Sequence, residues 1–278
     1  MEFRKPLLSP AASFAGWSTL IGLGARAWVP HPLRAPAYRA FARWVGADLG
    51  EVELELGAYD TFGDFFARKL RPGARPLAED EAAVIAPCDG TIAALGRVTH
   101  GTLVQAKGLN YRLADLVVDE AMAEHLDGGS YTTIYLSPRD YHRVHAPTGG
   151  RVIAYDYVPG ELWPVKPKYA TTREGLFTHN ERVVIWIESP QVGRFAVVMV
   201  GATGVGNIRL AHAEDSVNWR HAGERRRIEL DEPLARGDEL GAFRLGSTVV
   251  LVFEPGAARL VGDIGASVRF GEVLGEVA

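Results

Sequence analysis

The sequence contains one cysteine, no long uninterrupted apolar run and no excess of basic residues. The single thiol, Cys88, excludes an internal disulfide and a cysteine-cluster metal site, and it fits a reducing compartment. The formal net charge of -4 and the isoelectric point near 6.1 give no overall attraction to nucleic acid. No stretch reaches the roughly eighteen apolar residues that a membrane-spanning helix needs. We therefore expect no nucleic-acid partner, and any contact with a polyanion has to be local.

The chain does have the length and apolar content of a folded protein, with 278 residues of which 47% are hydrophobic. From Val84 onward, short apolar segments alternate with Gly, Pro, Asn and Asp, which is typical of strands and turns. Strands are expected at residues 91–98, 102–106, 131–136, 151–158, 182–188, 195–201, 207–210, 243–253 and 268–277. The polar interval 214–227 is expected to form a surface loop or hairpin. These patterns predict an α+β fold, with a mainly antiparallel β catalytic domain over residues 71–278.

Residues 1–70 are expected to form a helical region that associates with a membrane. Its most apolar segment, residues 11–29, contains three glycines and Arg26, and it has Trp17 and Trp28 near its ends. This composition suits a helix that lies in the membrane interface. A helix packed against the domain is the second interpretation. A secretory signal is the third, although no clear cleavage site follows.

Two further helices are expected before residue 71. Pro36 suits a first helical turn, and the residues after it place one apolar face together, formed by Tyr38, Phe41, Trp44 and Val45. The arginines Arg34, Arg39 and Arg43 indicate either an ordinary packed helix or one attracted to anionic lipid. Thr61 and Asp64 have the spacing of a capping box, which predicts a short helix in FGDFFARKL.

The densest cluster of chemically active side chains is SPRDYHRVHAPTGG at residues 137–150. His142 and His145 stand three residues apart, a spacing that two metal ligands can have. A catalytic metal site usually needs a third histidine or carboxylate, and nothing nearby supplies it convincingly. We therefore expect no metal, and the pair favours acid–base work.

Asp89, in APCDGT, and Ser247, in FRLGSTVV, add a carboxylate and a hydroxyl to this set. An Asp-Gly pair on its own most often marks an ordinary turn. Together with His145, however, the two residues supply the components of a carboxylate–histidine–hydroxyl relay, in which the imidazole removes the hydroxyl proton. Whether the three side chains meet is a question for the tertiary structure.

Gly246 and Ser247 interrupt an apolar strand pattern with small residues, which indicates that another group approaches the backbone there. An activated Ser247 hydroxyl would find the Gly246 carbonyl carbon as its nearest electrophile, and a glycine has no Cβ to obstruct the attack. The peptide bond would then shift to an ester. β-Elimination would release the chain after Gly246 and leave dehydroalanine, which loses ammonia to become an N-terminal pyruvoyl group.

At this point most of the chain resembles the phosphatidylserine decarboxylases, pyruvoyl enzymes that convert phosphatidylserine to phosphatidylethanolamine and carbon dioxide. The resemblance rests on TFGDFFARKLRPGARP, APCDGT, QAKGLNY, DYHRVHAP, the PGEL, NERV and VGAT segments, and GDELGAFRLGSTVVLVF. DYHRVHAP together with LGST is the specific combination. Leu109 in KGLNY stands where some members have a histidine, so no catalytic role is expected there.

The resemblance implies a role for each candidate residue. Asp89, His145 and Ser247 would form the self-processing triad, and cleavage between Gly246 and Ser247 would give a β chain (1–246) and an α chain (247–278). Residue 247 would carry the covalent pyruvoyl cofactor, and His142 would serve decarboxylation. The implied partners are phosphatidylserine and the membrane surface, with peripheral attachment at the cytoplasmic face of the cell membrane. The sequence leaves monomer and homodimer open.

Two other functions remain as alternatives. A serine hydrolase could use Asp89, His145 and Ser247, although LGST lacks the G-x-S-x-G elbow and lies in a strand pattern. A non-enzymatic lipid-binding β-sandwich would fit the faint repeat between residues 86–95 and 145–155. A carrier of a swinging cofactor is disfavoured, because neither repeat contains the lysine that such a cofactor needs.

Overall fold

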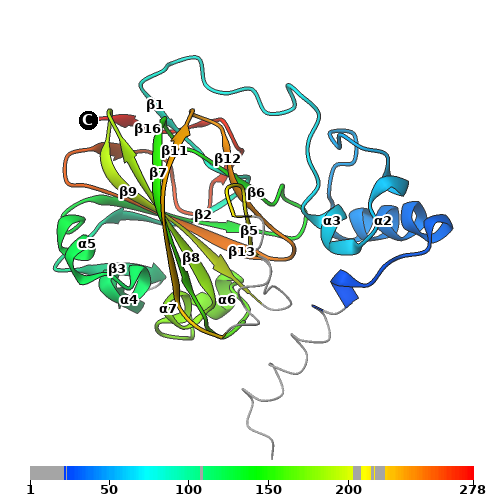
Figure 1. Cartoon of the computed structure of the whole chain (residues 1–278), viewed down its shortest axis with the longest axis horizontal. Helices are drawn as coiled ribbons and strands as arrows, with labels where there is room; N and C mark the ends of the chain where they lie inside the picture. The colour runs from blue at the N-terminus through cyan, green and yellow to red at the C-terminus, as the bar shows by residue number, and fades with distance from the viewer. Residues whose placement is uncertain (1–21, 23, 107–108, 203–207, 214–215, 217–222) are drawn as a thin grey trace, which may run out of the picture.

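An eight-stranded antiparallel sheet forms the centre of the protein in the computed structural model, which describes residues 22, 24–106, 109–202, 208–213, 216 and 223–278 (Figure 1). Its strand order is β11-β7-β8-β9-β13-β5-β2-β15. The strands, in chain order, are β2 (Gly90–Arg97), β5 (Ser130–Leu136), β7 (Gly150–Val158), β8 (Arg182–Ser189), β9 (Gly193–Gly201), β11 (Arg226–Leu234), β13 (Ser247–Phe253) and β15 (Ser267–Val268).

Three smaller antiparallel sheets and seven helical segments complete the described residues. The small sheets pair β1-β16-β14, β10-β12-β6 and β3-β4. Their strands are β1 (Ala83–Ile85), β3 (Thr102–Ala106), β4 (Leu109–Arg112), β6 (Arg143–His145), β10 (Ile208–Leu210), β12 (Glu239–Phe243), β14 (Ala258–Leu260) and β16 (Val273–Val277). The helices are α2 (His31–Val45), η1 (Leu56–Ala58), α3 (Phe62–Phe66), α4 (Leu113–Val117), α5 (Glu120–His125), α6 (Pro167–Ala170) and α7 (Leu176–His179). This arrangement confirms the predicted α+β fold with a mainly antiparallel β part.

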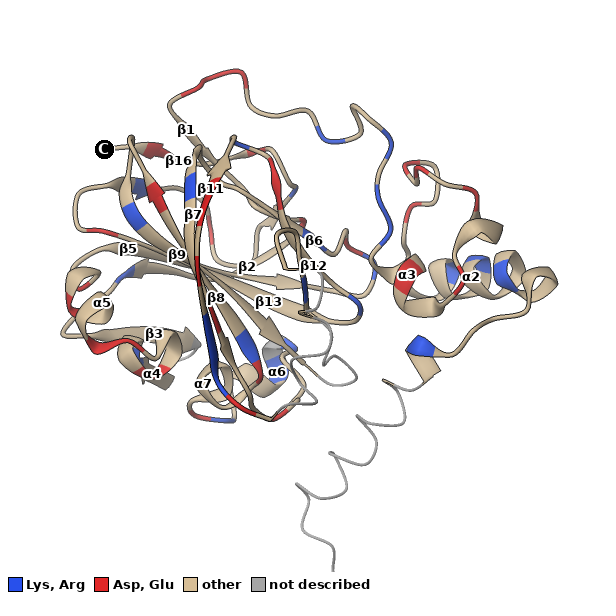
Figure 2. Cartoon of the chain, viewed as in Figure 1, with Lys and Arg blue, Asp and Glu red and all other residues tan. Residues whose placement is uncertain are grey.

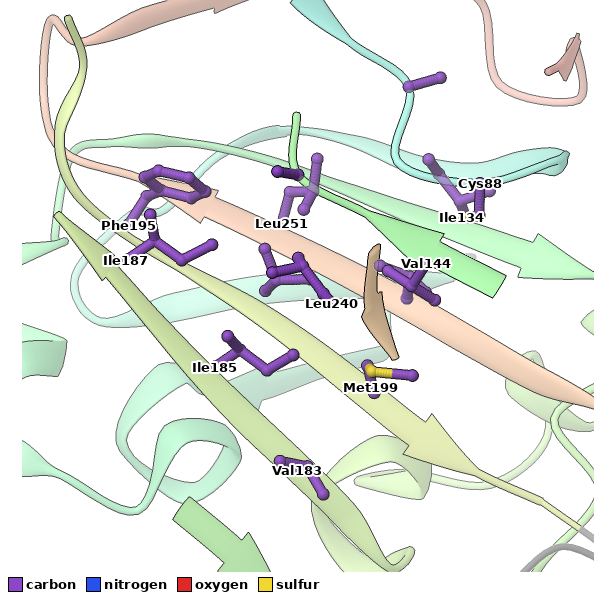
Figure 3. Close-up of a cluster of buried hydrophobic side chains, with 14 of the residues drawn as sticks. Cys88, Ile134, Val144, Val183, Ile185, Ile187, Phe195, Met199, Leu240 and Leu251 are labelled. Carbon is purple, nitrogen blue, oxygen red and sulfur yellow. The ribbon is translucent and has the colours of Figure 1, made fainter. Parts of the chain in front are cut away.

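Side chains alternate between the two faces of the large sheet along each strand. In its central strands, the side chains on both faces are buried. On β13, Val249, Leu251 and Phe253 join a cluster with the sheets of β1 and β12, part of which Figure 3 shows. Val250 and Val252 point to the opposite face and pack with residues of β3, β4 and α4 to α7. Burial on both faces explains why the strands of this antiparallel sheet read as continuous apolar runs.

The predicted strands are present, with two divisions that the sequence did not indicate. Residues 243–253 do not form one strand: β12 ends at Phe243, and β13 begins at Ser247 in a different sheet. The predicted strand 268–277 is likewise split into β15 and β16, with a turn between them. The interval 214–227 was expected to be a loop or hairpin, yet its last two residues begin β11. In the first two cases a change of partner strand, which the local pattern cannot encode, sets the boundary.

The helical region before residue 71 confirms the capping prediction and corrects two details. The Thr61 Oγ1 accepts a hydrogen bond from the Asp64 N–H, and the helix α3 that follows ends at Phe66. The helix α2 begins five residues before Pro36, which lies inside it. Trp44 does not join the packed face of α2, because it is 82% exposed.

Most of the predicted interfacial segment, residues 11–29, lies outside the described residues. Among the described residues, no helix is long and apolar enough to cross a membrane. α2 and α3 lie beside the β sheets in Figure 1, where α3 approaches the ends of β6 and β12. The division of the chain into two domains at residue 70 stays a prediction.

Candidate active site

Ser247 is the first residue of β13, and its side chain is completely buried. Its neighbours across the sheet are Leu136 on β5 and Gly201 on β9. By strand alternation its hydroxyl shares a face with Val249, toward the sheet that contains β6 and β12. The Ser247 Oγ has no hydrogen-bond partner among the described residues. Because a buried hydroxyl without a partner is costly, this atom stands out as a candidate for chemistry.

The connection from β12 to β13, residues 244–246, carries the predicted cleavage site. Gly246 is partly exposed, and a Cβ added to it would meet no atom within 4 Å. Packing therefore does not require a glycine at this position. The space on the Cβ side of Gly246 is open among the described residues.

The connection is fixed to the helical region through Arg244. Its guanidinium forms an ion pair with the Asp64 carboxylate of α3. A Cβ at Gly63 would lie 3.5 Å from the Arg244 Cβ and Cδ, so α3 also packs directly on this residue. Residues far apart in sequence thus hold the chain immediately before the predicted scissile bond.

His142 lies between β5 and β6 and is fully buried. Its Nδ1 is 2.8 Å from the Asp140 carbonyl oxygen, which can only accept, so Nδ1 carries the proton and Nε2 holds a lone pair. The Nε2 has no partner. Burial lowers the pKa of His142 to about 3, so the ring is neutral at pH 7. His142 also accepts a backbone hydrogen bond from Phe243, the last residue of β12, which brings it to the start of the 244–246 connection.

His145 has both ring nitrogens occupied. Its Nδ1–H donates to the Gly237 carbonyl oxygen at 2.9 Å, and its Nε2 accepts from the Tyr141 hydroxyl at 3.0 Å. The ring stacks on Phe270, with 3.8 Å between the ring centroids. Burial lowers the pKa of His145 as well, which leaves a neutral imidazole in a closed setting.

The Asp89 carboxylate does not bond to His145. It accepts three hydrogen bonds from the Arg75 guanidinium, the shortest at 2.7 Å, and one from the Phe270 N–H at 2.9 Å. The predicted relay of direct hydrogen bonds from Asp89 through His145 to Ser247 is therefore not formed. Phe270 links the two residues, because its backbone N–H bonds to the Asp89 carboxylate and its ring stacks on the His145 imidazole.

Three residues of this site were missed from the sequence: Arg75, Tyr141 and Phe270. Tyr141 stands inside DYHRVHAP, so its position beside the two histidines was a usable signal. Phe270 lies 181 residues from Asp89, and no local pattern indicates such a contact. Among the described residues, no group of three or more His, Cys, Asp or Glu is arranged to hold a metal ion.

The neutral state of His142 gives a pH-dependent stability. The pKa of His142 is about 3 in the folded protein, whereas an ordinary histidine, as in the unfolded chain, has a pKa of 6.5. Between these two values only the unfolded chain binds this proton. The free energy of unfolding should therefore be highest above pH 6.5 and fall as the pH drops toward 3. We expect His142→Gln to have a smaller decrease between pH 6.5 and 4, measured by urea unfolding.

The exposed His100, changed to Asn, provides the control, because its ring reaches water in the folded state. This control should keep the wild-type decrease. An equal decrease in the His142→Gln protein would show that His142 is not the group responsible.

Comparison with known proteins places these observations in a family. The family model for phosphatidylserine decarboxylase matches residues 62–276. A phosphatidylserine decarboxylase proenzyme of Anaeromyxobacter sp. (strain K) is 49% identical over 94% of this chain and 94% of its own. The proenzymes of Myxococcus xanthus (strain DK1622) and Acidovorax ebreus (strain TPSY) are 43% and 44% identical, over 86% and 87% of this chain and 85% and 87% of theirs. The chain belongs to the phosphatidylserine decarboxylase family.

Proposed function

We propose that this protein decarboxylates phosphatidylserine to phosphatidylethanolamine, using a pyruvoyl group that it forms from its own Ser247. The observation that carries the proposal is the fully buried, unpartnered Ser247 hydroxyl, which directly follows Gly246 at the junction of two sheets. Family membership supports the same conclusion, because the relatives are named as proenzymes of this activity.

Self-processing begins with attack of the Ser247 Oγ on the Gly246 carbonyl carbon, in the open space beside that peptide. Elimination then leaves the β chain, 1–246, with a carboxylate at Gly246, and the α chain, 247–278, with an unsaturated first residue that water converts to pyruvoyl and ammonia. We assign activation of Ser247 to His145, supported by Asp89. Because the His145 Nε2 accepts from Tyr141, this bond has to open before Nε2 can take the serine proton.

The surroundings of residue 247 suit a small neutral carbonyl group, because the residue is buried beside an apolar cluster. Its hydroxyl also forms no hydrogen bond with a described residue that the conversion would break. A pyruvoyl group there would supply the electron sink for the pair released as carbon dioxide leaves. We assign proton movement to His142. Its Nε2, which has no partner among the described residues, would hold the proton that is delivered to the carbon that has lost the carboxylate.

Cleavage at Ser247 can be read directly from intact mass under denaturing conditions. The wild-type protein should give two chains, of 246 and 32 residues, because residue 247 begins the smaller one (278 - 246 = 32). Ser247→Ala should stay a single chain of 278 residues and release no carbon dioxide from phosphatidylserine, since alanine has no nucleophile.

The matched control for this test is Ser189→Ala, which removes another buried strand serine at the end of β8. This protein should be cleaved like the wild type. An uncleaved wild-type protein with full decarboxylase activity would refute the pyruvoyl mechanism.

A His142 variant should distinguish self-processing from decarboxylation. His142→Gln should still form two chains, because Ser247 and His145 are unchanged. Its kcat for carbon dioxide release should fall by about 10²–10⁴-fold, the usual effect of losing a general acid–base group. His125→Gln, at a partly exposed histidine bonded to Glu254, is the control and should keep the wild-type kcat. Unchanged kcat in the His142 variant would remove this residue from the mechanism.

We further propose that the helical region attaches the protein peripherally to the cytoplasmic face of the cell membrane, where the substrate lies. Four large apolar side chains are exposed there among the described residues: Trp28, Leu33, Trp44 and Leu54. Basic residues also lie along α2 (Figure 2), and of these Arg39 and Arg43 are exposed whereas Arg34 is buried. Exposed aromatic and basic residues together suit an interface that contains anionic lipid.

Vesicle sedimentation tests this attachment. The combined change Leu33→Ala and Trp44→Ala should reduce binding to vesicles of phosphatidylcholine with 30% phosphatidylglycerol (about a tenfold effect), because it removes buried apolar area at the interface. Leu77→Ala, which removes a partly exposed leucine outside the helical region, should bind like the wild type. Equal binding by all three proteins would place the lipid contact elsewhere.

A further inference from the structure

Arg68 differs from every other buried arginine among the described residues. Arg34, Arg143 and Arg182 satisfy their guanidinium groups within the protein. Arg182 is the clearest comparison, because its Nε, Nη1 and Nη2 donate to four backbone carbonyl oxygens at 2.6–3.0 Å. The fold therefore supplies acceptors wherever an arginine is buried for structural reasons.

The Arg68 guanidinium lacks such acceptors. The residue is 3% exposed, and its only hydrogen bond among the described residues runs from Nη2 to the Arg139 carbonyl oxygen at 3.3 Å. Its Nε and Nη1 are buried without a partner. Burial lowers the pKa of Arg68, yet a guanidinium keeps its charge at neutral pH. A buried cation with two unused donors is costly unless an anion binds to it.

A cavity of about 330 Å³ lies against this side chain. Arg68 lines it together with Arg75, Asp89, Arg139, Asp140 and Arg269. A water molecule occupies about 30 Å³, so the space accommodates a phosphate or carboxylate group with its hydration. Arg68, with its two unused donors, is therefore part of the wall of a cavity that has room for an acceptor.

The carboxylates of the cavity do not occupy the Arg68 donors. Asp89 is held by Arg75 and the Phe270 N–H. Asp140 Oδ2 accepts from the Ser137 N–H at 2.7 Å and from the Ser137 hydroxyl at 2.8 Å. Arg75 is neutralised by Asp89 and Glu51, whereas two donors of the buried Arg68 have no partner among the described residues.

We propose that this cavity binds an oxyanion, a phosphate or carboxylate group, and that Arg68 is its principal ligand. A guanidinium suits such groups because it can offer two parallel N–H donors to two oxygens. The occupant is either the anionic part of a phospholipid headgroup or free phosphate.

The cavity lies close to the candidate active site. Gly90 lines it, and the next residue, Thr91, pairs with Tyr135, as does Thr248 on β13. Two strand spacings of about 4.8 Å therefore separate β2 from β13, or about 10 Å. The lipid-headgroup form of the inference rests on the proposed function, whereas binding of an oxyanion does not.

Titration calorimetry with inorganic phosphate at constant ionic strength tests the site. The full-length Ser247→Ala protein is used beside the wild type, so that binding is measured without processing or turnover. Both should bind phosphate saturably, and Arg68→Gln should raise Kd at least tenfold in each. Arg112→Gln, which changes an exposed arginine outside the cavity, is the control and should leave Kd unchanged.

If Arg68→Gln does not fold, Arg68→Lys tests the role of Arg68 in phosphate binding. A lysine keeps the charge but cannot offer the planar pair of donors, so a Kd several-fold above the wild type is expected. An unchanged Kd in a folded Arg68 variant, or no saturable phosphate binding by the wild type, would overturn the proposal.

A second titration, with glycerophosphoserine, identifies the source of the oxyanion. Binding at least tenfold tighter than that of phosphate, and dependent on Arg68, identifies a lipid headgroup as the occupant. Equal or weaker Arg68-dependent binding identifies phosphate itself. If phosphate binds through Arg68 but the wild type never forms two chains, the oxyanion site stands and the proposed function fails.

Discussion

The burial of β13 on both faces of the large sheet is the constraint on which the rest of the structure depends. Every residue of this strand is buried, and β5 and β9 pair with it along its length. A strand in this position has no access to water, so each polar group that it carries needs a partner or a function. At its first two residues, Ser247 and Thr248, that requirement is not met by any of the described residues, and of the two Ser247 follows the predicted scissile bond.

Two other buried side chains near the site also have polar atoms without a partner among the described residues. His142 is neutral and has an unused Nε2, and Arg68 is charged and has two unused donors. Both contact the helical region: His142 packs on Phe66 of α3, and Arg68 follows directly after that helix. Buried polar atoms without partners are unfavourable for stability, and residues at functional sites often carry such a cost.

The helical region also contacts the candidate active site. The ion pair between Arg244 and Asp64 joins α3 to the chain before the predicted scissile bond. The Arg143 Nε also donates to the Ala67 carbonyl oxygen at 3.0 Å, which fixes β6 to the end of α3. Through these two contacts, the helical region that carries the exposed Trp28, Leu33 and Trp44 is joined to the candidate active site.

The sequence by itself determined the elements and the candidate residues. Alternating and continuous apolar runs placed the strands, the Thr61 and Asp64 pair marked the start of α3, and DYHRVHAP with LGST indicated the family. These features are local, because side-chain periodicity, capping and short motifs are written over a few neighbouring residues.

Only the tertiary structure decided which side chains meet. It divided the apolar run 243–253 between two sheets, gave Asp89 to Arg75 and Phe270, and occupied both nitrogens of His145 while leaving the Nε2 of His142 free. It also buried Arg68 beside a cavity. Each of these outcomes depends on contacts between segments far apart in the chain, and such contacts leave no signal in the periodicity or spacing of a single sequence.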